Sequence, residues 1–202
     1  MKRFLSAFLL VLTFNAYATS KPITPIFEDG DIILQTSQSS QSQAIQLATH
    51  SKWTHTGIIF YLSGTAYVYE AEGPVGYRSL TAWIASGLNG KYLVRRNSTP
   101  LTSAQVASLK SEGANYAGLP YDIYFSWDDS EMYCSELVWK IYDRALGISV
   151  GTLQKLGDMD LSSPQVQAIL RQRYGDNIPY DETVITPQAI SVSTNLVTVY
   201  QN

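Results

Sequence analysis

Met132-Tyr133-Cys134-Ser135-Glu136-Leu137-Val138-Trp139 is the stretch around which the chain is organised, because it places the single cysteine at the start of an expected helix. The apolar residues that follow recur at helical spacing, at Leu137, Val138, Ile141, Ala145 and Leu146. Cys134 would then lie at a helix amino terminus, where free N–H groups and the helix dipole favour a thiolate. This environment suits a nucleophile, although a lone cysteine is more often a small buried hydrophobic residue.

The composition is that of one globular domain. Of the 202 residues, 45% are hydrophobic and 15% charged, with a formal net charge of -3. These values exclude a disordered chain and the basic surface of a nucleic-acid-binding protein. The 14 tyrosines and 4 tryptophans favour a sheet-containing protein with amphipathic pocket walls. No repeat or second linker divides the chain, so a single domain is expected at 19–202.

Residues 1–18 have the pattern of a cleavable secretory signal. Lys2 and Arg3 precede an apolar run from Phe4 to Phe14, and Ala16-Tyr17-Ala18 supplies the small residues of a cleavage site. The run is shorter than the roughly 20 residues needed to span a bilayer. The mature protein is therefore expected to begin at Thr19, to be periplasmic or secreted, and to have no integral membrane segment.

Export limits the roles that Cys134 can have. Oxidising compartments favour paired cysteines, and the chain has no second cysteine with which to form an intramolecular disulfide. A single exported thiol is then either buried and inert or kept for its reactivity, so the question becomes whether the chain supplies a base.

The rest of the sequence predicts a mixture of strands and helices. Strands are expected at 32–34, 53–62, 66–71, 91–96 and 196–200, the second and third forming a hairpin across 63–65. Helices besides that of Cys134 are expected at about 39–49, 80–84, 102–116, 164–173 and 186–189. The first of these should cover one edge of the site, and the helix near 102 opens with a Thr-x-x-Gln capping box. Residues 73–76 are expected to be a turn and 123–132 an ordered loop.

The candidate base is one of two histidines. His55 opens a strongly apolar strand and so has a fixed position, whereas His50 lies in the polar turn His50-Ser51-Lys52. His55 is therefore the better candidate, although a histidine in a strand is more often structural than catalytic.

Glu70, in the partner strand of the hairpin, is the candidate partner of His55. A carboxylate among the aromatic residues of that strand needs a partner if it is buried, and the hairpin can bring it across to the imidazole. There it would accept the ring N–H, fix the tautomer and stabilise the imidazolium. The alternatives are Glu72, nearer the following turn, and a Glu70 side chain that faces water.

Other chemistries are not indicated. One cysteine, two histidines and scattered carboxylates show no ligand pair at zinc spacing, so no metal and no cofactor is expected. The chain contains no glycine-rich phosphate or dinucleotide loop.

Three motifs follow one another in a specific order: His55-Thr56-Gly57-Ile58, then Glu70, then Tyr133-Cys134-Ser135-Glu136-Leu137-Val138. This order resembles the circularly permuted papain-like amidases of the YiiX/YaeF group, within the NlpC-type superfamily. Supporting segments are Gly30-Asp31-Ile32-Ile33, Gly118-Leu119-Pro120-Tyr121-Asp122 and Thr186-Pro187. The resemblance covers nearly the whole mature chain.

The resemblance implies an α+β, circularly permuted papain-like fold, with an antiparallel sheet or open barrel packed on the cysteine helix. It also implies Cys134 as nucleophile, His55 as base and Glu70 as the orienting residue. The thiolate would attack an amide or ester carbonyl and pass the acyl group to water or another acceptor. The Cys134 backbone N–H is a natural oxyanion donor, and Tyr121 or Tyr133 could supply a second through its hydroxyl.

The substrate is left open between two classes. Cell-wall peptide is the common target of the superfamily, whereas relatives in the permuted branch act on lipids. The aromatic stretch from Tyr121 to Trp127 fits an apolar pocket wall and favours an acyl or lipid-linked amide, although these aromatics could instead be core. The competing function is a non-catalytic lipid- or peptidoglycan-binding module, since a fold does not fix a function.

Overall fold

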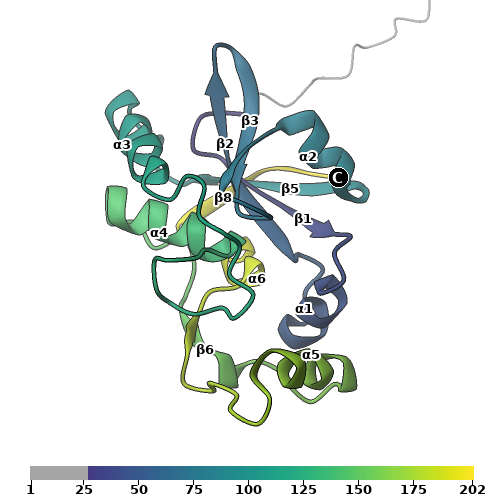
Figure 1. The fold of residues 1–202 in the computed structure, drawn as a ribbon. Helices are drawn as coiled ribbons and strands as arrows, with labels where there is room; N and C mark the ends of the chain where they lie inside the picture. Colours follow the sequence, from purple (N-terminus) through teal and green to yellow (C-terminus); the bar gives the residue numbers. More distant parts are fainter. Residues whose placement is uncertain (1–26) are drawn as a thin grey trace, which may run out of the picture.

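The computed structural model describes residues 27–202, so the predicted signal at 1–18 lies outside the described residues. At its centre is an antiparallel sheet in the order β4-β3-β2-β1-β5-β8 (Figure 1). Its strands are β1 (Ile32–Ser37), β2 (His55–Leu62), β3 (Thr65–Glu70), β4 (Gly76–Ser79), β5 (Gly87–Asn97) and β8 (Leu196–Gln201). The sheet is open, with β4 and β8 as its edges, so the expected antiparallel sheet is confirmed.

Six α-helices accompany the sheet in the described part of the chain. They are α1 (Ser42–Thr49), α2 (Leu80–Ser86), α3 (Ser103–Ala114), α4 (Cys134–Leu146), α5 (Pro164–Tyr174) and α6 (Pro187–Ser191). Each of them was predicted, with bounds that differ by a few residues. The capping box is also confirmed, with Thr102 and Gln105 as its two members. Within residues 27–202 no helix has the length and apolar character needed to cross a membrane.

The sequence did not reveal three short strands. β4 pairs with β3 directly after the expected turn, and β6 (Gln154–Lys155) pairs with β7 (Thr183–Val184) in a separate two-stranded sheet. Strands of two to four residues are too short to show an alternating pattern, and their pairing depends on tertiary contacts.

Helices cover both faces of the main sheet. Side chains that alternate along β1 and β2 point to opposite faces, so Ile32 and Ile58 pack with Leu137 of α4, while Ile33 and Ile59 pack with Trp83 of α2. Burial on both faces explains why these strands are continuously apolar. It also brings the amino end of α4 to the sheet beside the start of β2.

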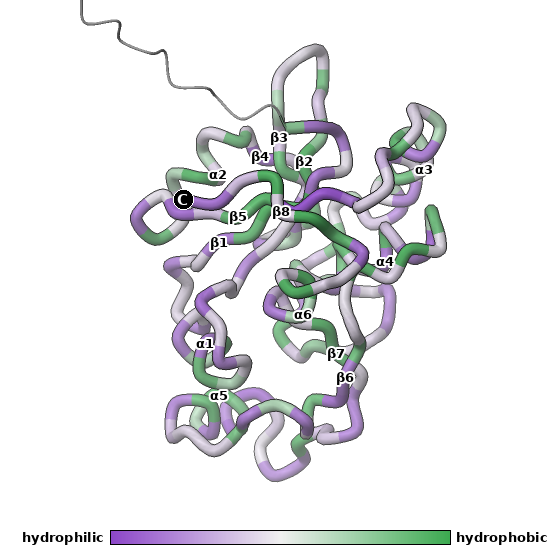
Figure 2. Tube along the Cα trace, turned by 180° about the vertical axis from the view of Figure 1, so that it is seen from behind, coloured by the Kyte–Doolittle hydropathy of each residue, from purple (hydrophilic) through white to green (hydrophobic). Residues whose placement is uncertain are grey.

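A third apolar cluster lies away from the sheet. It joins α1, α5, β7 and a 3-10 turn at Leu156–Asp158, and its buried members are Ala44, Ala48, Leu156, Val166, Leu170 and Val184. Figures 1 and 2 show α1 and α5 side by side, with apolar residues in both helices. This cluster supports one wall of the pocket described below.

The β2–β3 hairpin fixes the distance between His55 and Glu70. Its register pairs Ile58 with Tyr69 and continues to the turn. A Cβ atom at Gly57 would lie 2.4 Å from Val68 Cγ1 and 3.3 Å from Glu70 Cβ. Only glycine therefore allows this close approach of the strands, two residues from the histidine.

Candidate active site

Cys134 is the first residue of α4, where the sequence placed it. Its side chain is buried, with 5% of its surface exposed, and it is a free thiol. Glu136 reaches back to accept a hydrogen bond from the backbone N of Tyr133 at 3.2 Å. The other N–H groups of the first turn have no intrahelical acceptor, so the positive end of the helix dipole lies at the sulfur.

His55 begins β2 and is buried in the same region. Its Nε2 lies 2.6 Å from Glu70 Oε2, and its ring stacks on Trp83 with centroids 5.7 Å apart. Because Glu70 holds Nε2, the nitrogen available to sulfur is Nδ1. The imidazole interacts with Cys134 through both a hydrogen bond and charge. By contrast, His50 is exposed and pairs with Asp160 at 3.1 Å.

These contacts raise the pKa of His55 to about 10. Burial by itself lowers the pKa of an imidazole, but the charge of the Cys134 thiolate and the hydrogen bond to it, together with those of Glu70, outweigh that effect. The imidazole is therefore protonated at neutral pH, and its positive charge lies beside the sulfur of Cys134.

Glu70 is buried and accepts from three donors. Besides His55, the indole Nε1 of Trp83 donates to Oε2 at 2.6 Å and Arg78 Nε lies 3.1 Å from Oε1. The alternative in which Glu70 faces water is thereby excluded. Glu72, the other alternative, is exposed and pairs with Arg78. Of the two carboxylates, Glu70 is the one that holds the imidazole.

Trp83 and Arg78 belong to the site but were missed by sequence reasoning. Trp83 is fully buried on α2, and a buried indole N–H needs an acceptor. A buried tryptophan therefore indicates that some acceptor lies nearby, but not which residue supplies it. Arg78 reaches Glu70 because β4 pairs with β3, with Glu70 opposite Gly76. No local sequence pattern predicts this strand.

Among residues 27–202, His55, Glu70 and Glu72 form one group of three side chains whose potential metal-ligand atoms lie within 4.8 Å of one another. Each of these side chains already has a protein partner. The guanidinium of Arg78 contacts both carboxylates, and Glu70 bonds the imidazole. The charge of Arg78 already balances the two carboxylates, so this group does not fit a metal site.

The two tyrosines proposed as oxyanion donors both line the pocket with Cys134. The Tyr133 hydroxyl accepts a hydrogen bond from the backbone N of Ile185 at 3.1 Å. This bond fixes the hydroxyl against the segment that leads into α6. Ser135 is fixed to the same segment, because its hydroxyl donates to the Ile185 carbonyl at 2.8 Å.

Tyr121 is held near the sulfur by the base of its loop. A parallel bridge joins Tyr121 to Met132, two residues before Cys134. The Tyr121 hydroxyl contacts the Gln41 side chain and interacts with the charge of Cys134. Burial raises the pKa of Tyr121 well above its ordinary value, so the hydroxyl keeps its proton. Both tyrosines interact with the charge of Cys134.

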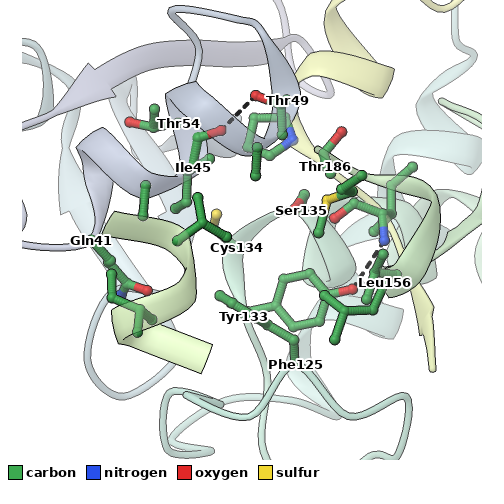
Figure 3. Close-up of a pocket in the computed structure, with 18 of the residues that line it drawn as sticks. Gln41, Ile45, Thr49, Thr54, Phe125, Tyr133, Cys134, Ser135, Leu156 and Thr186 are labelled. Carbon is green, nitrogen blue, oxygen red and sulfur yellow. Dashed lines mark hydrogen bonds between the residues drawn. The ribbon is translucent and has the colours of Figure 1, made fainter. Parts of the chain in front are cut away.

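The pocket in front of Cys134 is predominantly apolar. It encloses about 740 Å³ of space, which includes the open solvent at its mouth. Figure 3 shows Gln41 and Ile45 from the α1 region, Phe125 and Tyr133, and Leu156 grouped around Cys134. The aliphatic part of the lining comes mainly from the third cluster: Ala44, Ala48, Leu156, Val166, Leu170 and Val184.

Two expectations about this lining can be compared with the structure. The helix expected at 39–49 does cover one side of the site, as α1. The aromatic stretch from Tyr121 to Trp127 was predicted to be either a pocket wall or part of the core, and the structure contains both. Tyr121 and Phe125 line the pocket, whereas Trp127 packs edge-on against Trp139 with centroids 5.5 Å apart.

Comparisons with known proteins agree with this geometry. Residues 27–200 match the family described as permuted papain-like amidase enzyme, YaeF/YiiX, C92 family. The chain is 54% identical over 172 residues to the uncharacterized protein YiiX of Escherichia coli K12, covering 85% of each chain.

A solved structure is similar over the same region. It is described as the metalloprotein yiiX from Escherichia coli O157:H7 and superposes with a TM-score of 0.85 at 52% identity. The match covers 87% of this chain and 97% of that one. On both sequence and structure, the chain belongs to the YaeF/YiiX family of permuted papain-like amidases.

Proposed function

We propose that this protein is an exported cysteine hydrolase that cleaves an amide or ester bond through Cys134, His55 and Glu70. The observation that carries the proposal is the position of the His55 ring, which is held between the sulfur and a buried carboxylate. The nucleophile, the base and the orienting group are thus adjacent in space in that order, as covalent catalysis requires. The amidase description of the family supports the reaction class, and the sequence pattern of 1–18 supports export.

In the proposed reaction the Cys134 thiolate attacks the scissile carbonyl. The oxyanion accepts from the Cys134 backbone N–H and from the Tyr121 hydroxyl. His55 then gives its Nδ1 proton to the leaving amine, the C–N bond breaks and a thioester remains on Cys134. Water attacks the thioester as His55 takes its proton, which releases the carboxylic acid and restores the ion pair. Glu70 holds Nε2 throughout.

The pocket supports an acyl or lipid-linked amide as the substrate. Its aliphatic lining adjoins the sulfur, so an acyl chain attached to the scissile carbonyl can be buried there at roughly 25 cal/mol per Å² of apolar surface. A cell-wall peptide would place polar groups against the same wall. The acyl chain is therefore the better match, and the cell-wall peptide is the second candidate.

The metal of the Escherichia coli O157:H7 relative is not assigned a role in this reaction. That protein is described as a metalloprotein, but in this chain the three clustered side chains His55, Glu70 and Glu72 are engaged by one another and by Arg78. A metal ion would have to displace the arginine and break the bond that orients the base.

The same pocket favours one competing function, a non-catalytic lipid-binding module. The two functions differ in whether a covalent intermediate forms. We expect a p-nitroanilide of dodecanoic acid to release p-nitroaniline and to leave a dodecanoyl group on Cys134, seen by intact mass spectrometry after rapid acid quench. The adduct should be absent from Cys134→Ala. Binding of the anilide with neither product nor adduct would establish the binding module instead.

The ion pair also predicts a pH dependence. The pKa of His55 is about 10 in the folded protein, above its ordinary value of 6.5, so protonation favours the folded state. This contribution is complete below about pH 6.5 and is lost as the pH rises through about 10. We expect kcat/KM to fall with an alkaline midpoint near pH 10, because the leaving amine needs the imidazolium proton.

The free energy of unfolding gives an independent measurement of the same group. Between pH 7 and pH 10 it should decrease more in the wild type than in His55→Gln, as measured by urea unfolding at each pH. Equal pH profiles for the two proteins, or an alkaline midpoint of activity close to the ordinary imidazole pKa, would mean that the ion pair does not form.

A further inference from the structure

Arg173 is the one lysine or arginine among the described residues that line the pocket, and no aspartate or glutamate lines it. It lies in the last turn of α5 and is half-buried. Its neighbours in the lining are the aliphatic residues of the third cluster together with a few hydroxyl and amide groups. An unpaired charge is costly away from water, so a guanidinium in this apolar lining points to a role in binding.

The contacts of Arg173 leave most of its donors available. Its Nη2 donates to Gln41 Oε1 at 2.7 Å, and its guanidinium carbon lies 4.8 Å from the centroid of the Phe125 ring. In the described part of the chain no carboxylate lies within ion-pair distance of it, whereas Arg78, Arg96 and Arg144 each have at least one. A guanidinium carries five N–H donors, of which this arrangement uses few.

Arg173 is connected to the nucleophile through two polar side chains. Gln41, which accepts from Arg173, also contacts the Tyr121 hydroxyl. Tyr121 in turn interacts with the charges of both Cys134 and Arg173. The pocket therefore has a polar path from Arg173 to the sulfur along one side, beside the aliphatic wall.

We propose that Arg173 binds an anionic group of the substrate, a carboxylate or a phosphate, and so makes the enzyme selective for acyl amides that carry a negative charge. The planar guanidinium can donate two parallel hydrogen bonds to either anion, with its face packed on Phe125 and its position fixed by Gln41. The substrate class would be an amphiphilic acyl amide with an acidic group near the scissile bond. This inference rests on the proposed function and names the chemistry of its substrate.

The test compares substrates that differ only in charge. N-dodecanoylglycine and N-dodecanoylglycinamide share chain length and amide bond, and N-dodecanoylethanolamine phosphate and N-dodecanoylethanolamine form a second pair. We expect kcat/KM of the wild type to favour the anionic member of at least one pair about 10-fold or more, since hydrogen bonds to charged groups have this magnitude. The pair with the larger preference distinguishes carboxylate from phosphate.

Variants then assign the preference to one residue. Arg173→Gln should remove the preference for the anionic substrate, and Arg173→Lys should keep part of it. Arg173→Glu should reverse the preference in favour of the neutral substrate. The matched control is Arg171→Gln, because Arg171 lies on the same helix, is exposed and does not line the pocket. Arg171→Gln should keep both the charge preference and the wild-type rate on neutral substrates. No charge preference in the wild type, or the same loss in the Arg171 control, would overturn the proposal.

A binding measurement separates this inference from the proposed function. In Cys134→Ala, isothermal titration with dodecanoate and dodecyl phosphate should give tighter binding than with dodecanol, and Arg173→Gln should abolish the difference. Charge-dependent binding without any turnover would refute the hydrolase while leaving the anion site in place. Turnover through Cys134 with no dependence on charge would refute the anion site alone.

Discussion

Cleavage of the dodecanoyl anilide should fall to the uncatalysed rate in Cys134→Ala and decrease about 10²–10⁴-fold in His55→Ala. The first variant has no sulfur to form the thioester. The second keeps the sulfur but loses both the partner that stabilises the thiolate and the acid that protonates the leaving amine. Initial rates under substrate excess measure both effects. The rate of iodoacetamide labelling should also decrease in His55→Ala, because less of the sulfur is thiolate.

The control for this pair is the second histidine. His50→Ala removes an exposed imidazole whose partner is Asp160, and it should leave both turnover and labelling unchanged. Urea unfolding of each variant would show that the losses are not due to misfolding. If His55→Ala retained wild-type turnover, or if labelling of Cys134 were no faster than that of a free thiol in the wild type, the activated pair would not exist.

Replacing Lys140 with methionine should lower the free energy of unfolding by about 3–5 kcal/mol, the usual cost of removing one member of a buried ion pair. Lys140 and Glu136 are 1% and 0% exposed, and Nζ lies 2.7 Å from Glu136 Oε1 without hydrogen-bond geometry. The ammonium also donates to the Asp128 carbonyl and to Asp129 Oδ1, each at 2.8 Å. Urea unfolding at pH 7 measures the loss.

The effect should extend to the start of α4. Burial raises the pKa of Glu136, and the ammonium of Lys140 opposes this shift by favouring the carboxylate. Without the lysine the carboxyl takes up a proton more readily, which weakens its hydrogen bond to the backbone N of Tyr133. The double variant Lys140→Met with Glu136→Gln keeps a neutral acceptor for that N–H and should recover much of the lost stability. Equal stability of the single and double variants would contradict a buried ion pair.

The sequence predicted those features that depend on local pattern. The start of α4 at Cys134, the hairpin around 63–65 and the strands flanking it follow from apolar spacing and turn residues, and the structure contains all of them. The closeness of His55 and Glu70 could be inferred from the same hairpin. In each case the residues concerned are neighbours along the chain or across one turn.

Features that depend on long-range packing could not be predicted in this way. Trp83 completes the environment of Glu70 from α2, and Arg78 does so from a strand of four residues. The pocket wall combines α1 with α5, segments more than a hundred residues apart, as in the bond between Arg173 and Gln41. No local periodicity encodes such a contact, so the charge of the pocket appeared only in the structure.

The third apolar cluster has a consequence for how the family can diverge. Its buried residues pack against one another on α1, α5 and β7, whereas His55, Glu70 and Trp83 depend on the two cores that sandwich the sheet. Substitutions at sites with no shared partners act nearly independently. Drift in α1 and α5 can therefore reshape the pocket wall while Cys134, His55 and Glu70 are inherited unchanged. If the proposed hydrolase function holds, orthologues are expected to vary in chain-length preference far more than in reaction chemistry.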